Sequence, residues 1–493
     1  MFVDLASLHM GAAWPLLIVA LGALVLLAVE AVWPGAGRRH GPWLSATTFV
    51  ASLALTALSW PGAGLAFFGM LAADAYAHFC WGLFAAVGLL VVMLSDAYAP
   101  EHSEAVGSGD YYILLLLATS GMMLMAAGMS LIIIFLGLEV LSVSLYALAG
   151  ILRERALSNE AALKYLLLGA FASAFLLYGI ALVYGATGSF DLTVAARWAA
   201  SDPGNLLLLG GAALIIVGLG FKAAVAPFHM WAPDVYQGSP TAISAFMSVG
   251  PKAAALAALA RVFVGALPTL SPRWGQALAV LAVLSMTTGN VVALAQTDVK
   301  RMLAYSSVAH AGYALVAVVA VGPRGTEALL YYLAAYAVMN IGAFGVVLWV
   351  GSGSCASEEA HTSLSDYAGL GWSHPWLGFA MATFMFGLAG IPPTAGFAAK
   401  FYAFSAAVDS GYVWLAVVGV LNSLLSVFFY LRLTVLMYMR EPEVAASPLS
   451  ECSFDPPRGV TFALAACVLG TLAFGLFPQS LLNLAAEAIR LLP

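Results

Sequence analysis

The sequence predicts an all-α integral membrane protein with about fourteen transmembrane helices, two inverted five-helix repeats and two broken helices, the seventh and the twelfth. Apolar residues make up 63% of the 493 residues, charged residues only 9%, and the mean hydropathy is +0.97. A soluble domain of this length carries roughly a quarter charged residues. Because so few polar residues cannot cover the core with a water-facing surface, the surrounding solvent must be lipid.

The apolar residues fall into runs close to the roughly 20 residues that a helix needs to cross the hydrocarbon core. No lysine or arginine precedes the first run and no small-residue cleavage site follows it, so it is interpreted as a span and not as a signal peptide. The longest polar stretches, around 96–110, 351–373 and 440–458, leave no room for a soluble domain or for a nucleotide or flavin site. The expected spans are 14–33, 43–60, 76–95, 111–127, 130–151, 162–185, 205–225, 238–266, 275–296, 303–321, 327–350, 374–392 with 395–409, 412–439 and 459–485.

Lysine and arginine residues set the expected orientation, because loops that stay inside the cell carry more of them. With the N-terminus outside, eight of these residues fall in inner loops and four in outer loops. Both termini are therefore expected on the outer, periplasmic face. The inner set is Arg38, Arg39, Arg153, Arg155, Lys300, Arg301, Arg440 and Arg458, and the outer set is Arg197, Arg273, Arg324 and Arg490.

The order of the spans indicates an internal repeat. Spans four to eight and nine to thirteen form two sets of five, and an odd number of spans per unit leaves the second copy upside down. We therefore divide the chain into an N-terminal three-helix segment (1–110), a first five-helix repeat (111–267), a second, inverted repeat (275–439) and a C-terminal loop with the last helix (440–493).

Prolines interrupt the corresponding span of each repeat. Pro227 and Pro233 fall in the seventh span, and Pro392 and Pro393 follow Gly390 in the twelfth. Proline removes a backbone donor, and lipid does not tolerate the break unless it lines a cavity inside the protein. The matched breaks predict a polar pathway near the middle of the membrane. The alternative is that each kink only helps the helices to pack.

The chain contains only five lysines, and most lie in or beside apolar spans. Lys222, Lys252 and Lys400 lie inside spans, Lys164 lies near the start of the sixth, and Lys300 is expected in a loop. Burying an ammonium group costs at least about 2.5–3.5 kcal/mol. Burial lowers the pKa of a lysine, so that it can exchange a proton near neutral pH, whereas arginine stays charged. A row of buried lysines therefore predicts a proton relay.

Two charged residues in the first repeat are expected to act together. Glu139, in the middle of the fifth span, is the one carboxylate well inside a span, and an ion pair with Lys222 would couple their protonation states. The alternative is a structural carboxylate that accepts a hydrogen bond from Ser142 or from a neighbouring helix. Lys222 precedes the Pro227 break, where carbonyls that end the first half-helix are expected to face its ammonium group. Snorkelling to the inner face is the alternative for this lysine.

Three further residues extend the predicted relay. Lys252 lies too deep in the eighth span to snorkel easily, and Lys400 follows the second break as the counterpart of Lys222 or Lys252. His310, in the tenth span, could pass protons between the halves because its unperturbed pKa is near 6.5. The alternative for this histidine is a packing role. Lys164 is a second-tier candidate, since it could snorkel to the inner face.

Other chemistries lack the residues that they require. The four scattered cysteines, Cys80, Cys355, Cys452 and Cys467, form no C-x-x-C pair, which argues against an iron–sulfur cluster, a structural zinc site or a disulfide framework. Only His78 and His310 lie in or beside spans, which disfavours a membrane haem. No phosphate-binding G-x-x-x-x-G-K-[ST] loop is present. The driving force for proton movement is therefore expected from outside the chain or from another ion gradient.

Four long motifs resemble one family, the antiporter-like membrane subunits of NADH:quinone oxidoreductase (complex I). The motifs are FLGLEVLSVSLYALAG, FKAAVAPFHMWAPDVYQGSPTAISAFMSVGPKAA, DVKRMLAYSSVAHAGY and GIPPTAGFAAKFYAF. The DVYQG stretch, together with Lys400, is most similar to the subunit N type, and fourteen spans match the bacterial form. The resemblance covers essentially the whole chain and is strongest over 111–440.

This resemblance implies one proton channel in the membrane arm of the complex. By similarity, Glu139 and Lys222 form the coupling pair, Lys252 and His310 the central relay, and Lys400 the outlet. The implied location is the bacterial inner membrane, among other complex I subunits and especially neighbouring antiporter-like subunits, with no nucleic acid. The chain itself is expected to hold no cofactor, because FMN and the iron–sulfur clusters belong to partner subunits and quinone is the substrate of the complex.

Two other functions stay open at this point. A subunit of a multi-subunit cation/proton antiporter shares the fold and the Glu–Lys pair, and it would show sodium-dependent exchange that does not depend on NADH. A quinone-binding scaffold that does not pump would keep proton translocation intact when Lys222 or Glu139 is replaced.

Overall fold

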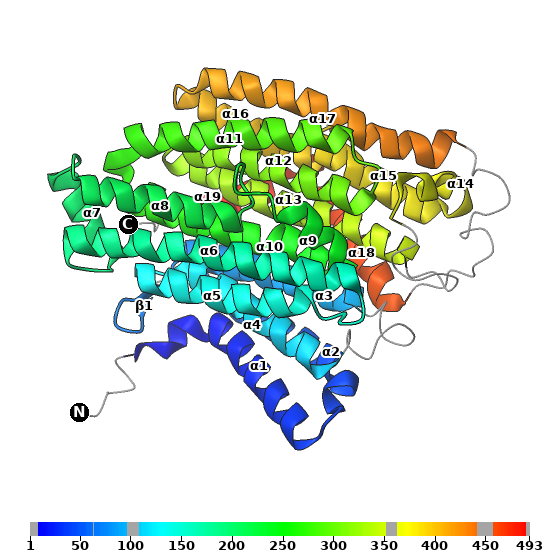
Figure 1. Ribbon diagram of the computed structural model, residues 1–493, viewed down its shortest axis with the longest axis horizontal. Helices are drawn as coiled ribbons and strands as arrows, with labels where there is room; N and C mark the ends of the chain where they lie inside the picture. The colour runs from blue at the N-terminus through cyan, green and yellow to red at the C-terminus, as the bar shows by residue number, and fades with distance from the viewer. Residues whose placement is uncertain (1–7, 63, 96–107, 352–361, 441–456, 490–493) are drawn as a thin grey trace.

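The computed structural model describes residues 8–62, 64–95, 108–351, 362–440 and 457–489, and these form a bundle of roughly parallel and antiparallel helices (Figure 1). Within this part of the chain, twelve helices are long and apolar enough to cross a membrane, and two further apolar helices are shorter. The all-α membrane fold is thereby confirmed. The long helices are α1 (Trp14–Val32), α2 (Ala36–Leu58), α3 (Ala75–Ser95), α4 (Gly109–Ala127), α5 (Leu131–Ala149), α6 (Ala156–Thr187), α10 (Thr241–Ala260), α11 (Ser271–Leu294), α12 (Val299–Val319), α13 (Pro323–Gly351), α17 (Val413–Met439) and α18 (Arg458–Leu476).

The two shorter helices are the first halves of the broken spans. Helix α8 (Leu206–Lys222) ends before the first break and α9 (Ala232–Gly238) follows it. Helix α15 (Pro375–Ala389) ends before the second break and α16 (Ala395–Asp409) follows it. Both interruptions lie where the prolines predict them. The order of three whole helices, one broken span and one further helix occurs twice, and the inverted relation between the two sets stays a prediction.

Backbone groups at the breaks are satisfied by protein atoms, as the membrane interior requires. The backbone N–H of Ala226 donates to Ser285 Oγ at 2.9 Å, and the Trp231 indole donates to the carbonyl of Phe221 at 3.1 Å. At the second break, Gly390 ends α15 with φ of 85°, a left-handed conformation that glycine adopts readily. Protein atoms therefore satisfy these backbone groups, while Pro227, Met230, Pro392 and Pro393 of the two breaks are exposed at the surface of the chain.

Several elements differ from the predicted spans. The expected last span, 459–485, is wrong as one helix: α18 ends at Leu476, and a separate helix, α19 (Pro478–Ile489), begins at Pro478, which cannot donate to the preceding turn. A short helix, α7 (Leu192–Ser201), starts where Asp191 Oδ1 accepts from the backbone N–H of Thr193 at 2.6 Å. Strands β1 (Leu65–Ala66) and β2 (Leu71–Ala72) form an antiparallel hairpin. The remaining short elements are the 3₁₀ helices Met10–Ala13, Pro268–Leu270 and Leu364–Tyr367, the π-helical turn Arg261–Ala266 and α14 (Leu370–Ser373).

The two ends of the bundle differ in charge. We call the end at the right of Figure 1, where α14 lies, the arginine-rich face, and the end at the left, with β1 and α7, the hairpin face. Helix direction assigns the described arginines outside the bundle interior to these two ends, and Arg490 lies outside the described residues. The arginine-rich face has Arg38, Arg39, Arg153, Arg155, Arg301, Arg440 and Arg458, and the hairpin face has Arg197, Arg273 and Arg324.

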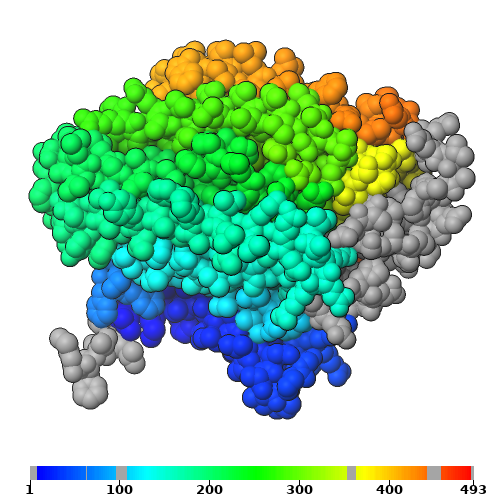
Figure 2. Space-filling model, viewed as in Figure 1, coloured from blue at the N-terminus to red at the C-terminus, as the bar shows by residue number. Residues whose placement is uncertain are grey.

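Helix α10 lies at the centre of the bundle, and all of its residues are buried. Helices α12 and α13 pack against it and are also almost wholly buried. Large apolar side chains instead cover the outward sides of the peripheral helices, including Phe171 and Tyr178 of α6 and Phe428 of α17. Figure 2 shows this outer surface, with α6 and α8 in the middle of the view and α17 along the top. Polar groups in α10, α12 and α13 must therefore find partners inside the protein.

Candidate functional site

Lys222 lies at the end of α8, beside the first break, and is 2% exposed. Its Nζ donates to Ser142 Oγ at 2.9 Å and to the Tyr165 hydroxyl at 3.0 Å. The Tyr165 ring in turn stacks on Trp231 with 4.4 Å between ring centroids. The expectation that half-helix carbonyls hold this lysine is wrong, because two hydroxyl groups from α5 and α6 do so. Its burial also removes the snorkelling alternative.

Glu139 lies on α5, one turn before Ser142, and is only partly buried. Its Oε1 accepts from Ser173 Oγ of α6 at 2.5 Å. Among the described residues no carboxylate lies within 4.0 Å of the Lys222 ammonium, so the expected direct ion pair is absent. The hydrogen bond from a neighbouring helix, which the alternative for Glu139 predicts, is present. A cavity of about 10 Å³, close to the size of one water molecule, is lined by Ser142, Ser173 and Lys222.

Lys252 lies in the middle of α10 and is 2% exposed. Its Nζ donates to Ser307 Oγ of α12 at 2.6 Å, and the ring centroid of Tyr236 lies 5.8 Å away. The Ser307 hydroxyl in turn donates to the carbonyl of Ala304 at 2.6 Å. Lys252, on the last helix of the first repeat, therefore contacts α12 of the second repeat. Its burial agrees with the prediction that it lies too deep in the eighth span to snorkel.

His310 lies one turn beyond Ser307 on α12 and is 3% exposed. Its Nδ1 is 2.7 Å from the Tyr332 hydroxyl and its Nε2 is 3.2 Å from the Tyr430 hydroxyl. The Tyr336 ring stacks on the imidazole with 5.0 Å between centroids. Both ring nitrogens are thus in hydrogen bonds to groups that can donate or accept, which a residue that only packs does not need.

Lys400 lies on α16, after the second break, and is 5% exposed. Its Nζ donates to the carbonyls of Leu388 and Ala389, at 3.0 and 2.9 Å, and to Ser423 Oγ at 2.8 Å. These carbonyls end α15, so the ammonium group sits at the negative end of a helix dipole. The environment expected for Lys222 is therefore found at Lys400.

Six polar side chains on α13 and α17, three of them in contact with His310, were missed by the sequence reasoning. They recur four residues apart on one side of α13 and α17, which was a usable signal, because polar residues at helical spacing inside apolar helices share one face. The Tyr336 hydroxyl and Asn340 Oδ1 have no hydrogen-bond partner among the described residues. The set is Tyr332, Tyr336 and Asn340 on α13, and Asn422, Ser426 and Tyr430 on α17.

Lys300 was expected in a loop, and this expectation is wrong. Asp298 caps α12 by accepting from the backbone N–H of Arg301 at 2.8 Å, so Lys300 lies in the first turn of the helix. It is 4% exposed, and its Nζ donates to the carbonyl of Ser239 at 2.8 Å. This contact ties the start of α12 to the end of α9.

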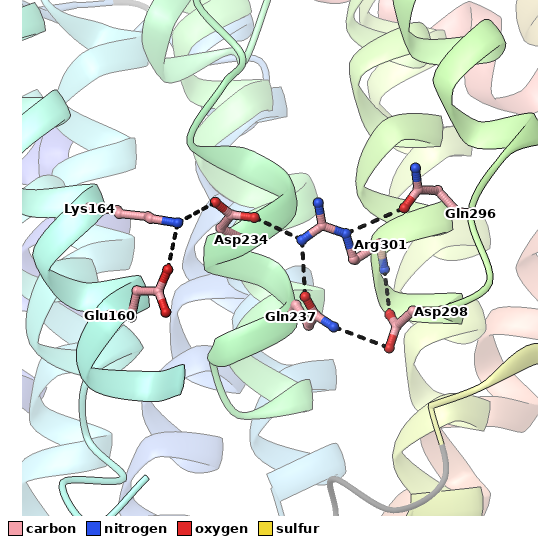
Figure 3. Close-up of polar contacts among 7 residues, drawn as sticks. All are labelled: Glu160, Lys164, Asp234, Gln237, Gln296, Asp298 and Arg301. Atoms are coloured by element: carbon pink, nitrogen blue, oxygen red, sulfur yellow. Dashed lines mark hydrogen bonds and ion pairs between the residues drawn. The ribbon is translucent and has the colours of Figure 1, made fainter. Parts of the chain in front are cut away.

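Lys164 belongs to an ion-pair network at the arginine-rich face and not to the buried row (Figure 3). Its Nζ lies 2.6 Å from both Glu160 and Asp234, and its side chain is 40% exposed. Arg301 approaches Asp234 from the opposite side, with Nη1 2.7 Å from Oδ1, and also donates to Gln237 at 3.0 Å. Asp234, an acid that the sequence reasoning did not single out, therefore holds the second half of the broken span between α6 and α12.

Open hollows lie at both ends of the buried row. At the arginine-rich face, a hollow of about 1070 Å³ is lined by Asp110, Arg153, Glu154 and Tyr146. Tyr146 also lines the small cavity at Lys222, and its ring centroid is 5.7 Å from the lysine Nζ. At the hairpin face, a hollow of about 210 Å³ is lined by residues that include Arg324, Glu327, Ser405 and Asp409, and it lies beside the α16 helix that carries Lys400.

No cluster of three or more His, Cys, Asp or Glu side chains with metal-ligand geometry occurs in the described part of the chain. Cys80 and Cys467 are buried free thiols, and Cys355 and Cys452 lie outside the described residues.

Comparison with known proteins identifies the family of this fold and site. Residues 128–426 match the transmembrane family described as NADH:quinone oxidoreductase/Mrp antiporter. The NADH-quinone oxidoreductase subunit N of Chloroflexus aggregans is 46% identical over 481 residues, which cover 96% of each chain. The chain belongs to the NADH-quinone oxidoreductase subunit N family. The resemblance seen in the four motifs is confirmed.

Two solved structures place this subunit N family member among its structural relatives. A chain of respiratory complex I from Thermus thermophilus with bound aureothin is 37% identical, with a TM-score of 0.79 and coverage of 96% of this chain and 99% of that one. A chain of the Mrp complex from Dietzia is 23% identical with a TM-score of 0.83, covering 98% of each chain. At that identity, the second likeness concerns the fold alone.

Proposed function

We infer that the chain is a proton-translocating membrane subunit of a respiratory NADH:quinone oxidoreductase. One observation carries this inference: three buried lysines and a buried histidine lie along the two halves of the bundle, each hydrogen-bonded to hydroxyl or carbonyl groups and without a carboxylate within 4.0 Å among the described residues. Charges buried at this cost are functional by default in a membrane protein. The full-length relationship to proteins named subunit N supports the same assignment.

Protons would pass along the row from the first half to the second. Glu139 and Lys222 set the charge state at the start, Lys252 and His310 relay in the centre, and Lys400 is the outlet. Ser307 contacts Lys252, and Tyr430 joins His310 to Ser306, so hydroxyl groups link the titratable residues. The unpartnered Tyr336 and Asn340 atoms would bind internal water in the same region.

The hollow at the arginine-rich face would supply protons to this row. It reaches Tyr146, whose ring separates it from the cavity of Lys222. The hollow at the hairpin face would receive them after Lys400. The excess of arginine favours a cytoplasmic location for the arginine-rich face. The proposed location is the bacterial inner membrane, with both termini in the periplasm.

The chain would work inside a larger assembly. Neighbouring antiporter-like subunits and other complex I subunits are the proposed partners, in a lipid bilayer and without nucleic acid. FMN and iron–sulfur clusters would reside in partner subunits, and quinone would be the substrate of the whole complex. The division of the chain into residues 1–110, 111–267, 275–439 and 440–493 is also proposed, from the order of the helices and the two breaks.

Purification of the tagged chain from native membranes tests the assignment. Co-purifying flavin and iron–sulfur subunits with NADH:quinone activity are the expected result. The cation/proton antiporter is the second candidate, favoured by the family description that also names the Mrp antiporter and by the fold of the Mrp complex chain. Small membrane partners, no NADH activity and sodium-dependent proton exchange would establish it instead. Proton pumping in reconstituted vesicles separates both from a scaffold that does not pump.

A further inference from the structure

A groove beside α17 is lined by none of the residues of the proton row. Its volume is about 780 Å³, and it lies between α17, the end of α11 and residues 363–365 at the arginine-rich face. Helix α17 runs along the upper edge of the bundle in Figure 1, with its last turns at the right. The lining residues are Thr297, Ser363, Leu364, Ser365, Leu424, Val427, Phe428, Leu431, Arg432, Val435, Leu436 and Arg440.

One end of the groove is cationic. Arg432 and Arg440 both line it, and no carboxylate among the described residues lies within 4.0 Å of either guanidinium. Arg432 makes only long hydrogen bonds from Nη1, to the carbonyls of Leu294 at 3.4 Å and Gln296 at 3.3 Å. Its Nε and Nη2 have no acceptor within the described part of the chain. The groove therefore offers guanidinium donors in the fork geometry that matches a phosphate.

An apolar strip extends along α17 from the level of Arg432 toward Leu424. Leu424, Val427, Leu431 and Val435 recur every three or four residues and so share one side of α17. The strip from Leu424 to Val435 is about 16 Å long at 1.5 Å per residue. One leaflet of the hydrocarbon core is about 15 Å thick, half of the roughly 30 Å bilayer core. Leu424 is 70% exposed and Phe428 is 64% exposed, so the strip is open to the bilayer.

We propose that this groove binds one anionic phospholipid, with its phosphate between Arg432 and Arg440 and an acyl chain along Leu424–Val435. The hydroxyls of Thr297 and Ser365 line the headgroup end and supply further donors. Basic pockets beside transmembrane helices are known to take anionic lipid headgroups. A zwitterionic lipid fits the apolar strip equally well but carries an ammonium group that the two arginines repel. Charge therefore selects the headgroup, and the strip accepts any chain of this length.

Photo-crosslinking tests the site in the intact, purified complex. The probe is phosphatidylglycerol with a diazirine in one acyl chain, and labelled peptides of residues 424–440 are quantified by mass spectrometry. Unlabelled phosphatidylglycerol is expected to displace the probe about 25-fold more effectively than phosphatidylcholine with the same chains. Each arginine near the membrane surface contributes about 1 kcal/mol, or roughly fivefold in affinity.

Matched variants separate headgroup from chain. R440Q changes an exposed residue, and together with R432Q it is expected to remove the preference for phosphatidylglycerol. R39Q removes an exposed arginine of the same face that does not line the groove, and it should keep the preference. L431W retains both arginines but fills the strip, and it should abolish labelling of α17. NADH:quinone activity of each preparation reports assembly, so loss of the lipid site is distinguished from loss of the proposed function.

Three results would overturn the proposal. Equal displacement by phosphatidylcholine in the wild-type complex would show that the groove holds ordinary boundary lipid. Crosslinks from α17 only to a partner subunit, with no lipid label, would show that a protein covers the groove. A preference that survives R432Q/R440Q would likewise exclude the arginines as the headgroup site.

Discussion

The two broken spans bury a lysine in different ways. Lys222 precedes its break and is held by two hydroxyl groups, whereas Lys400 follows its break and is held by two backbone carbonyls and one hydroxyl. A carbonyl only accepts a hydrogen bond, so it favours the charged ammonium form. A hydroxyl donates or accepts, so it can serve both the charged and the neutral amine. The first site can therefore serve both protonation states of its lysine, whereas the second favours the protonated state.

The acid near the first site strengthens this contrast. Glu139 lies one turn from Ser142, which contacts Lys222, and nothing comparable lies beside Lys400 among the described residues. Glu139 is also only partly buried, so a neighbouring subunit could reach it. Charge changes that arrive from outside the chain would then act on the first half. The second repeat would respond to these charge changes through Lys252 and His310, the central residues of the row.

Replacing Lys222 is expected to have the largest effect on pumping. Lys222→Ala should lower proton translocation per NADH oxidised by at least about tenfold, since a positioned proton carrier commonly contributes that much or more. Lys222→Arg keeps the positive charge but does not release a proton, and it should fail to restore pumping. Fluorescence quenching by a pH-sensitive dye in proteoliposomes measures both. Lys164→Ala is the control, because that lysine is half-exposed and paired at the face of the bundle.

Removing the charge of Glu139 is expected to have the next largest effect. Glu139→Gln keeps the size of the side chain and an acceptor for Ser173, but it removes the negative charge near Lys222. Pumping should fall about fivefold, which corresponds to an interaction of about 1 kcal/mol. The same proteoliposome assay applies, with Glu160→Gln as a surface control. Unchanged pumping would mean that the Ser173 hydrogen bond, and not the charge, is the role of Glu139.

Alanine variants of two left-handed glycines separate the effect of backbone strain from the effect of displacing Lys400. Gly390→Ala places a methyl group 3.0 Å from Cδ and 3.3 Å from Nζ of Lys400, at a φ of 85°. Gly411→Ala meets a similar φ of 84° with no atom within 4 Å. Both variants should lose about 1–2 kcal/mol of stability in thermal unfolding, the usual strain of a left-handed residue. Only Gly390→Ala should also lower pumping, by about threefold; equal pumping in both would show that Lys400 tolerates displacement.

The sequence predicted the fold and the charged residues better than their contacts. Hydropathy and proline positions located the spans and both breaks, because lipid leaves few alternatives for the backbone. The partners of Lys222 could not be predicted, because the carbonyls at the end of α8 are taken by backbone groups and by the Trp231 indole. Lys300 was misplaced because the Asp298 cap, which begins α12, was not recognised. Tyr332 and Tyr430 required knowledge of which helix sides face each other.

The smallest expected effect comes from two serine variants, which compare the two lysine sites most directly. Ser142→Ala removes one of two hydrogen-bond acceptors from Lys222, whereas Ser423→Ala removes one of three from Lys400 and leaves both carbonyls. A hydrogen bond to a charged group contributes about 1.5–3 kcal/mol, but the remaining acceptors compensate for part of it. Pumping should therefore fall about twofold in Ser142→Ala and change little in Ser423→Ala, measured in matched proteoliposomes. If Ser423→Ala proved the more damaging, the carbonyls that end α15 would not be what holds Lys400, and the contrast between the two lysine sites would have to be abandoned.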